Sequence, residues 1–173
     1  MTTLAPGSYT AIVRSVDGTE GNALFELYDL FPGNSSLRNI STRGQAGTGD
    51  DVMIGGFIVG GTAPARIIIR AIGPSLVAFG ITGVLPDPVM ELYDKGGALI
   101  DQNDNWRSGH AQEIIDTTIP PSDEHESAIV ATLAPGAYTA IVHNAGTAEG
   151  WPWSRFTCST DNEDPPGHLR LTS

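Results

Sequence analysis

The sequence predicts an all-β protein, a two-sheet β-sandwich of jelly-roll type with no long helix. Short apolar runs rich in β-branched residues recur along the chain and indicate strands. Turn-forming residues separate these runs, since the 173 residues include 21 glycines and 12 prolines. About eight short strands without a long helix are typical of a sandwich or a jelly roll.

The first two predicted strands form a hairpin near the amino terminus. In residues 8–16 (SYTAIVRSV) side chains alternate in the period of two that is typical of a strand. A turn at Asp17-Gly18 leads to a second strand over residues 23–30 (ALFELYDL). Residues 31–49 are rich in glycine, serine, asparagine and threonine, so we predict a loop there.

The middle of the chain supplies six further predicted strands and one short helix. The strand predictions rest on apolar or alternating runs that glycine and proline turns bound. They cover residues 52–59, 66–72, 89–94, 98–102, 127–132 and 137–143. Residues 111–116 (AQEIID) are predicted as one or two helical turns.

A nearly identical segment occurs twice and suggests the domain organisation. TLAPGSYTAIV begins at Thr3 and TLAPGAYTAIV at Thr132, and twelve of nineteen positions agree at a constant spacing of 129 residues. That spacing is the length of a whole domain and too long for a solenoid repeat. We therefore predict that residues 1–38 are the terminal hairpin of a preceding repeat unit, packed on the main domain or swapped between chains. Residues 39–160 would form the β-sandwich domain, and residues 161–173 an irregular tail.

The second copy does not continue as the first one does. Residues 151–160 (WPWSRFTCST) lack strand alternation, and Pro152 cannot donate to a β-ladder. Codons for these residues read one base earlier can encode VALVEVYVLD, which is close to NALFELYDL at the matching place; a local frameshift is one hypothesis, and a diverged tail is the other. We predict that the amino-terminal hairpin fills the missing sheet position, within the chain or in a second copy, which would give a homo-oligomer.

Charge and cysteine content exclude several classes of function. Twenty acidic against nine basic residues give a net charge of −11, which repels nucleic acid and anionic membranes. The single cysteine, Cys158, excludes an internal disulfide and a thiolate metal cluster. No apolar run approaches the roughly 18 residues of a membrane span. The first residues lack the basic and apolar regions of a signal peptide.

Oxygen-bearing side chains gather after the predicted strand at residues 98–102 and suggest a metal site. Calcium prefers six to eight oxygen ligands from carboxylates, amides and carbonyls. We therefore predict a Ca²⁺ site from Asp101, Asn103, Asp104, Asp123 and Glu126. The spacing does not fit an EF-hand, and the alternative is an Asx-rich turn between strands.

Two further residues are candidates for ligand contact. Trp106 could stack on a sugar, or it could fill the core of the sandwich. His110 lies near the acidic segments and could act with a carboxylate as a general base, or it could be a surface loop residue. Ser75 does not lie in a nucleophile elbow, so the sequence identifies no catalytic residue.

Several long motifs carry a resemblance to a known family. ISTRG, VMIGGFIVGG, RIIIRAIGPSL, ELYD, NDNW and ESAIVATLAPGAYTAIV resemble segments of a repeat found in large bacterial extracellular proteins, over nearly all of residues 3–150. The half from Val89 to Val142 is similar, more distantly, to bacterial pre-peptidase C-terminal domains. The resemblance implies a β-sandwich, an extracellular or cell-surface location, calcium binding as in some relatives, and a role in secretion or substrate attachment.

Three functions are compatible with these observations. The first is an extracellular-type binding or attachment module that calcium stabilises. The second is a small calcium-dependent hydrolase, since the chain loosely resembles an acyl-homoserine lactone hydrolase recovered from environmental DNA; the resemblance implies that Ca²⁺ polarises the lactone carbonyl while a carboxylate or histidine activates water. The third is a carbohydrate-binding module with a polysaccharide ligand.

Overall fold

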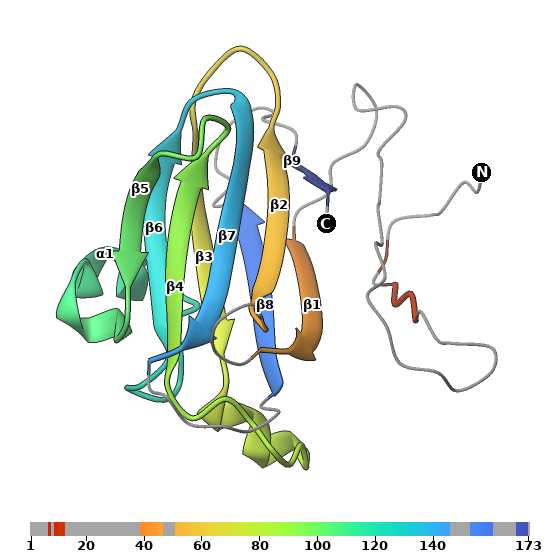
Figure 1. Ribbon diagram of the computed structural model, residues 1–173. Helices are drawn as coiled ribbons and strands as arrows, with labels where there is room; N and C mark the ends of the chain where they lie inside the picture. Colours follow the sequence, from red (N-terminus) through yellow and green to blue (C-terminus); the bar gives the residue numbers. More distant parts are fainter. Residues whose placement is uncertain are drawn as a thin grey trace.

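The computed structural model describes residues 7, 9–12, 39–46, 51–145, 153–160 and 169–172, and most of this part of the chain is in β-strands (Figure 1). The strands are β1 (Asn39–Gln45), β2 (Met53–Val59), β3 (Ala65–Ile72), β4 (Pro88–Asp94), β5 (Leu99–Asn103), β6 (Ser127–Leu133), β7 (Gly136–Asn144), β8 (Trp153–Thr160) and β9 (Leu169–Thr172). The helical segments are the 3-10 helices η1 (Pro74–Phe79) and η2 (Trp106–Ser108) and the α-helix α1 (Ala111–Asp116).

The strands form two antiparallel sheets that pack face to face. One sheet has the strand order β1-β8-β3-β6, and the other has the order β5-β4-β7-β2-β9. The prediction of an all-β sandwich without a long helix is confirmed. Its jelly-roll connectivity stays a prediction.

The six strands predicted in the middle of the chain all form, each within one residue of its predicted ends. The predicted helix at residues 111–116 forms as α1. The predicted hairpin of residues 8–16 and 23–30 lies outside the described residues, apart from residues 9–12. The sequence prediction missed β1, because its residues (NISTRGQ) are mostly polar and lack strand alternation.

Two predictions for the carboxyl-terminal part are wrong. The segment expected to make a poor strand forms β8, which lies between β1 and β3 and pairs with both of them. The expected irregular tail contains β9, which pairs with β2. Backbone pairing on two sides satisfies the peptide groups of β8 whatever its side-chain pattern, and Pro152 precedes the strand. β8 thus lies inside the four-stranded sheet, and the packing of the amino-terminal hairpin stays a prediction.

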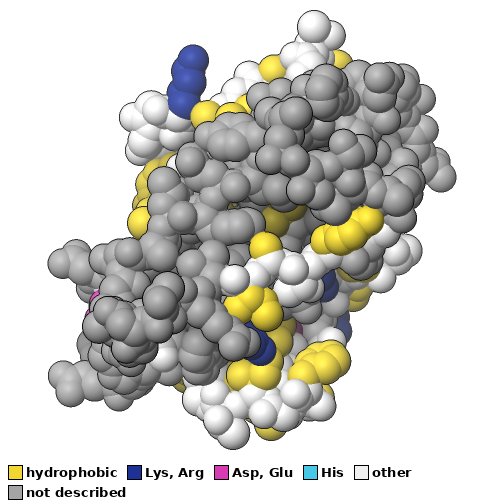
Figure 2. Space-filling model, turned by 90° about the vertical axis from the view of Figure 1, so that its right-hand side faces the viewer, with side chains coloured by type: hydrophobic (Ala, Val, Ile, Leu, Met, Phe, Trp, Pro, Cys, Tyr) yellow, Lys and Arg dark blue, Asp and Glu magenta, His cyan; other side chains and the backbone are white. Residues whose placement is uncertain are grey.

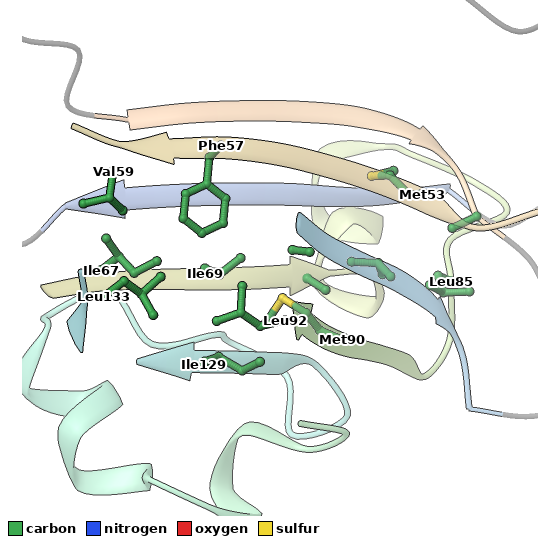
Figure 3. Close-up of a cluster of buried hydrophobic side chains, with 14 residues drawn as sticks. Met53, Phe57, Val59, Ile67, Ile69, Leu85, Met90, Leu92, Ile129 and Leu133 are labelled. Atoms are coloured by element: carbon green, nitrogen blue, oxygen red, sulfur yellow. The ribbon is translucent and has the colours of Figure 1, made fainter. Parts of the chain in front are cut away.

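The main core lies between the two sheets. Inward-facing side chains of β2, β3, β4, β6 and β7 interdigitate there, and Figure 3 shows several of them, among them Phe57, Ile69 and Leu92. The ring of Phe57 stacks on that of Tyr138 with 5.5 Å between the centroids. Burying one such side chain stabilises the fold by about 1.5–3 kcal/mol.

A smaller cluster covers the outer face of the four-stranded sheet. The segment between β5 and β6, which includes η2 and α1, packs Trp106 and Ile114 against outward-facing side chains of β3 and β6. The outer face of the five-stranded sheet is different. It faces the viewer in Figure 1, and Ile54 of β2 is 55% exposed on it.

The two ends of the sandwich differ in the length of their connections. Residues 60–64, 95–98 and 134–135 make short links at one end, where the chain also enters β1 and leaves β8. Residues 73–87 connect β3 to β4 at the opposite end, and residues 104–126 connect β5 to β6 there. We call these two long connections together the loop end; in Figure 1 residues 73–87 lie at the bottom and α1 lies at the lower left.

One contact of the repeated segment, between its glycine and its tyrosine, occurs in both copies. A methyl group placed on Gly136 would lie 3.7–3.8 Å from atoms of the Tyr138 ring, and one placed on Gly7 would lie 3.6–3.7 Å from the ring of Tyr9. Tyr138 also donates a hydrogen bond to the carbonyl of Ala134 at 2.8 Å. The tyrosine therefore packs back over its glycine in each copy, although Tyr9 is 58% exposed.

Replacing Ile69 by alanine is expected to lower the free energy of unfolding by about 2–5 kcal/mol, because Ile69 is fully buried and its loss leaves a cavity. Ile54→Ala is the matched control in an exposed strand position and is expected to cost about 0.5 kcal/mol or less. Urea unfolding of both variants measures the difference. Equal losses would contradict the assignment of the inner face.

Candidate functional site

The loop end is organised around the buried carboxylate of Glu126. This side chain is fully buried just before β6. Its Oε1 accepts hydrogen bonds from the N–H groups of Gly73 (3.1 Å) and Ser75 (3.0 Å) and from the Ser75 hydroxyl, while its Oε2 accepts one from the N–H of Asp123 (3.3 Å). Such bonds offset the cost of burying a carboxylate. We call this arrangement the Glu126 clasp; it joins the two long connections.

The connection of residues 73–87 is pinned near both of its ends. A Cβ atom on Gly73 would lie 2.0 Å from the carbonyl oxygen of Leu85, so only glycine allows this close approach. Pro74 opens η1, and Gly80, at φ 75°, ends it. Leu76 and Leu85 are buried. The connection is therefore a closed loop whose apolar residues are partly in the core.

The connection of residues 104–126 is tied to the same place through Trp106. Its backbone N–H donates to the carbonyl of Glu126 (2.9 Å), and its Nε1 donates to the carbonyl of Asp123 (3.0 Å). The guanidinium of Arg107 lies 4.0 Å from the centre of the Trp106 ring. At the end of β5, Asn103 accepts a hydrogen bond from the N–H of Ala128 at 3.0 Å. These contacts hold the start and the end of the connection together.

The five predicted calcium ligands serve other partners or lie apart. The oxygens of Asn103 and Glu126 accept the N–H groups described above, and Oδ1 of Asp101 accepts the N–H of Gln102 at 2.8 Å. Oδ1 of Asp123 accepts the N–H of His125, and Asp104 is exposed. No group of three or more histidine, cysteine, aspartate or glutamate side chains within the described ranges could hold a metal ion. The calcium site stays a prediction without support from this geometry.

The two candidates for ligand contact differ in position. Trp106 is only 2% exposed, and its ring and its N–H both have partners, so the expectation that it stacks on a ligand is without support. His110 is exposed at the start of α1, and its Nδ1 lies 3.1 Å from a carboxylate oxygen of Glu113. His110 therefore pairs with a carboxylate of its own helix.

The pKa values of two carboxylates of the loop end are shifted in opposite directions. Burial raises the pKa of Asp87 above its usual value, the negative charge of Asp104 raises it further, and His125 opposes the shift. Oδ1 of Asp87 is buried and has no hydrogen-bond partner in the described part of the chain. The pKa of Asp123 is lowered, chiefly because the N–H of His125 donates to it at 2.9 Å. The contributions of Asp87 and Asp123 to folding stability therefore change with pH in opposite directions.

Exposed apolar side chains at this end were not singled out from the sequence. Phe79 is 79% exposed and Val77 60% exposed, and both belong to η1, whose Leu76 points into the core. We call Val77 and Phe79 the apolar tip. The run of apolar residues in GPSLVAFG is the signal that could have indicated them. Hydrophobic side chains also reach the surface elsewhere, as Figure 2 shows for the face on the right of Figure 1.

The fold and this site define a β-sandwich module with one elaborated end. In comparisons with known proteins, the chain matches no protein-family model and no curated protein. The resemblance to an extracellular repeat therefore stays an expectation. No helix in the described ranges is both long and apolar enough to span a lipid bilayer.

Replacing Glu126 by glutamine is expected to lower the free energy of unfolding by about 1–3 kcal/mol, because an amide N–H₂ group would face N–H donors in a buried place. Ser75→Ala removes one hydrogen bond and is expected to cost about 1 kcal/mol. Glu124→Gln is the control, since this exposed carboxylate forms only a surface ion pair with Arg107. A Glu126→Gln variant as stable as the parent in denaturant unfolding would contradict the role of the clasp.

Replacing Asp87 by asparagine is expected to stabilise the protein at neutral pH. A raised pKa means that the folded state holds its proton more tightly than the unfolded state does, so this group costs stability as pH rises through the raised value. The gain should vanish below about pH 4, where the aspartate is protonated in both states. Thermal unfolding from pH 3 to pH 8 measures it.

The matching variant of opposite sign is Asp123→Asn, because the pKa of Asp123 is lowered. It should lose stability at neutral pH, and the loss should shrink on acidification through the lowered pKa. The same pH trend in both variants would refute the opposed assignments.

Proposed function

We propose that this chain is a non-catalytic, extracellular-type attachment module that contacts its ligand with the loop end. The observation that carries the proposal is a strongly exposed phenylalanine on a loop that is pinned near both ends. Binding residues are often found on loops that a stable scaffold positions. The sandwich is such a scaffold, and its long connections gather at one end.

The chemistry of the loop end favours binding. Glu126 and Asn103 use their oxygens to hold backbone N–H groups, and the Ser75 hydroxyl donates to Glu126, so these polar groups maintain the loops. Phe79 and Val77 do not hold the loops together, because their side chains are exposed to solvent while Leu76 beside them is buried. They are therefore accessible to a ligand. A ligand that covers the Phe79 side chain gains about 1.5–3 kcal/mol of apolar burial.

Single exposed apolar residues are common on protein surfaces. The apolar tip differs because its two residues are close in sequence on one short 3-10 helix, and the Glu126 clasp fixes the start of that helix. A pre-ordered loop loses little conformational entropy when it binds. The extracellular location rests on the sequence resemblance alone.

The double variant Val77→Ser/Phe79→Ser is expected to reduce retention of the tagged chain on its ligand surface about tenfold or more, because it removes the apolar contact area. Cellulose, chitin and gelatin-coated beads serve as the surfaces. Ile54→Ser is the matched control on the open sheet face and should change retention less than twofold.

The lactone hydrolase is tested on the same preparations. Opening of an N-acyl-homoserine lactone is assayed with calcium and with a chelator, and we expect no turnover in either. Turnover that the chelator abolishes would overturn the proposed function. So would an absence of retention on every surface, or retention that the tip variant and the control reduce equally.

A further inference from the structure

The apolar tip is presented on a loop that leaves it little freedom to withdraw. The Glu126 clasp holds the backbone N–H groups of Gly73 and Ser75, directly before and within the first turn of η1. The close contact of Gly73 with Leu85 closes the loop behind the helix. The three side chains that follow the buried Leu76 in η1 are exposed, Phe79 most strongly at 79%.

The loop end is also the most acidic part of the described chain. Its two connections, residues 73–87 and 104–126, contain seven carboxylates and one arginine, whereas the whole chain has twenty acidic and nine basic residues. That arginine, Arg107, already has partners, since its Nε lies 3.3 Å from Glu124 and its guanidinium covers the Trp106 ring. The loop end that bears the apolar tip therefore carries an excess of acidic residues.

Some of these carboxylates are paired within the described part of the chain, as Glu113 is with Arg66 at 3.7 Å, but one oxygen of Asp87 is not. Its Oδ1 is buried without a hydrogen-bond partner among the described residues, and Asp104 repels it. His125 acts to lower the pKa of Asp87. Its Nδ1, however, lies 3.1 Å from a carboxylate oxygen of Asp123. A cationic group brought by a ligand would form charge-assisted hydrogen bonds here.

We propose that the loop end docks a polypeptide segment in which aliphatic or aromatic side chains stand next to lysine or arginine. The apolar side chains cover Val77 and Phe79, and the basic side chains face Asp87 and Asp104. This inference rests on the proposed function and specifies its ligand. A neutral polysaccharide has no cation to offer these carboxylates, and an anionic membrane surface would be repelled.

Charge complementarity of this kind raises association rates and makes them depend on salt. An apolar anchor within a charged rim is a common arrangement of binding surfaces.

The test uses phage-displayed random dodecapeptides selected on the immobilised full chain. We expect the enriched peptides to combine lysine or arginine with aliphatic or aromatic residues. The best peptide is then synthesised, and its Kd is measured by fluorescence anisotropy at 50 and 300 mM salt. Phe79→Ser should weaken its binding at least tenfold, and Phe79→Tyr should preserve most of it.

The charge is tested separately from the apolar contact. The double variant Asp87→Asn/Asp104→Asn should weaken the peptide severalfold at low salt and flatten the salt dependence. Ile54→Ser, the control on the open sheet face, should change Kd less than twofold. Near-UV circular dichroism verifies that each variant keeps the parent fold. If Phe79→Ser does not keep the fold, the binding of the Phe79→Tyr variant still tests the apolar contact.

Three results would overturn the inference: enrichment of acidic or uncharged peptides, no enrichment, or binding that Phe79→Ser and Ile54→Ser reduce equally. Its failure is distinguishable from failure of the proposed function. If the tip variant loses retention on cellulose or chitin while peptide binding is independent of the tip, the attachment function stands and the polypeptide ligand is rejected. If neither depends on the tip, both are rejected.

Discussion

The buried carboxylate of Glu126 is the interaction on which the loop-bearing end of this sandwich depends. Four hydrogen bonds from three residues converge on its two oxygens, and those from Gly73 and Ser75 join residues 53 and 51 positions apart in sequence. An apolar residue in its place would leave the N–H groups of Gly73 and Ser75 unsatisfied near the core. The carboxylate of Glu126 therefore supplies hydrogen-bond acceptors for irregular backbone, as the carbonyl groups of a neighbouring strand do in a β-ladder.

The two ends of the sandwich differ in structure because their connections differ in length. Tight links at one end restrict the register of the strand pairs, while the long links at the other end carry most of the polar and exposed apolar groups discussed above. Trp106 contributes both to the packing on the sheet and to the geometry of the loop. Its ring packs on the outer face of the four-stranded sheet, and its N–H groups fix the long link between β5 and β6. Core packing and loop geometry are thus coupled through one side chain.

The strands in the middle of the chain could be predicted because their side-chain pattern matches their burial, as in β2 and β3. The side-chain patterns of β1 and β8 do not predict strands. These strands form because they pair with strands distant in sequence. The sequence indicated Glu126 as a site residue but not that its oxygens accept backbone N–H groups, because that depends on which loop folds against it. The exposure of Phe79 depends on the direction in which η1 leaves the sheet. The local sequence pattern does not predict this direction.

The tyrosine that packs back over its glycine carries a consequence for how the chain folds. Gly7 and Tyr9 adopt this arrangement just as Gly136 and Tyr138 do, although Tyr9 is largely exposed and residues 9–12 are not in a strand. The arrangement is therefore encoded within a few residues. A turn with such local encoding closes early at low entropic cost, so the β6–β7 hairpin is a natural nucleus. The strands that pair across the longest sequence separations, β1 with β8 and β2 with β9, would then be the last to join.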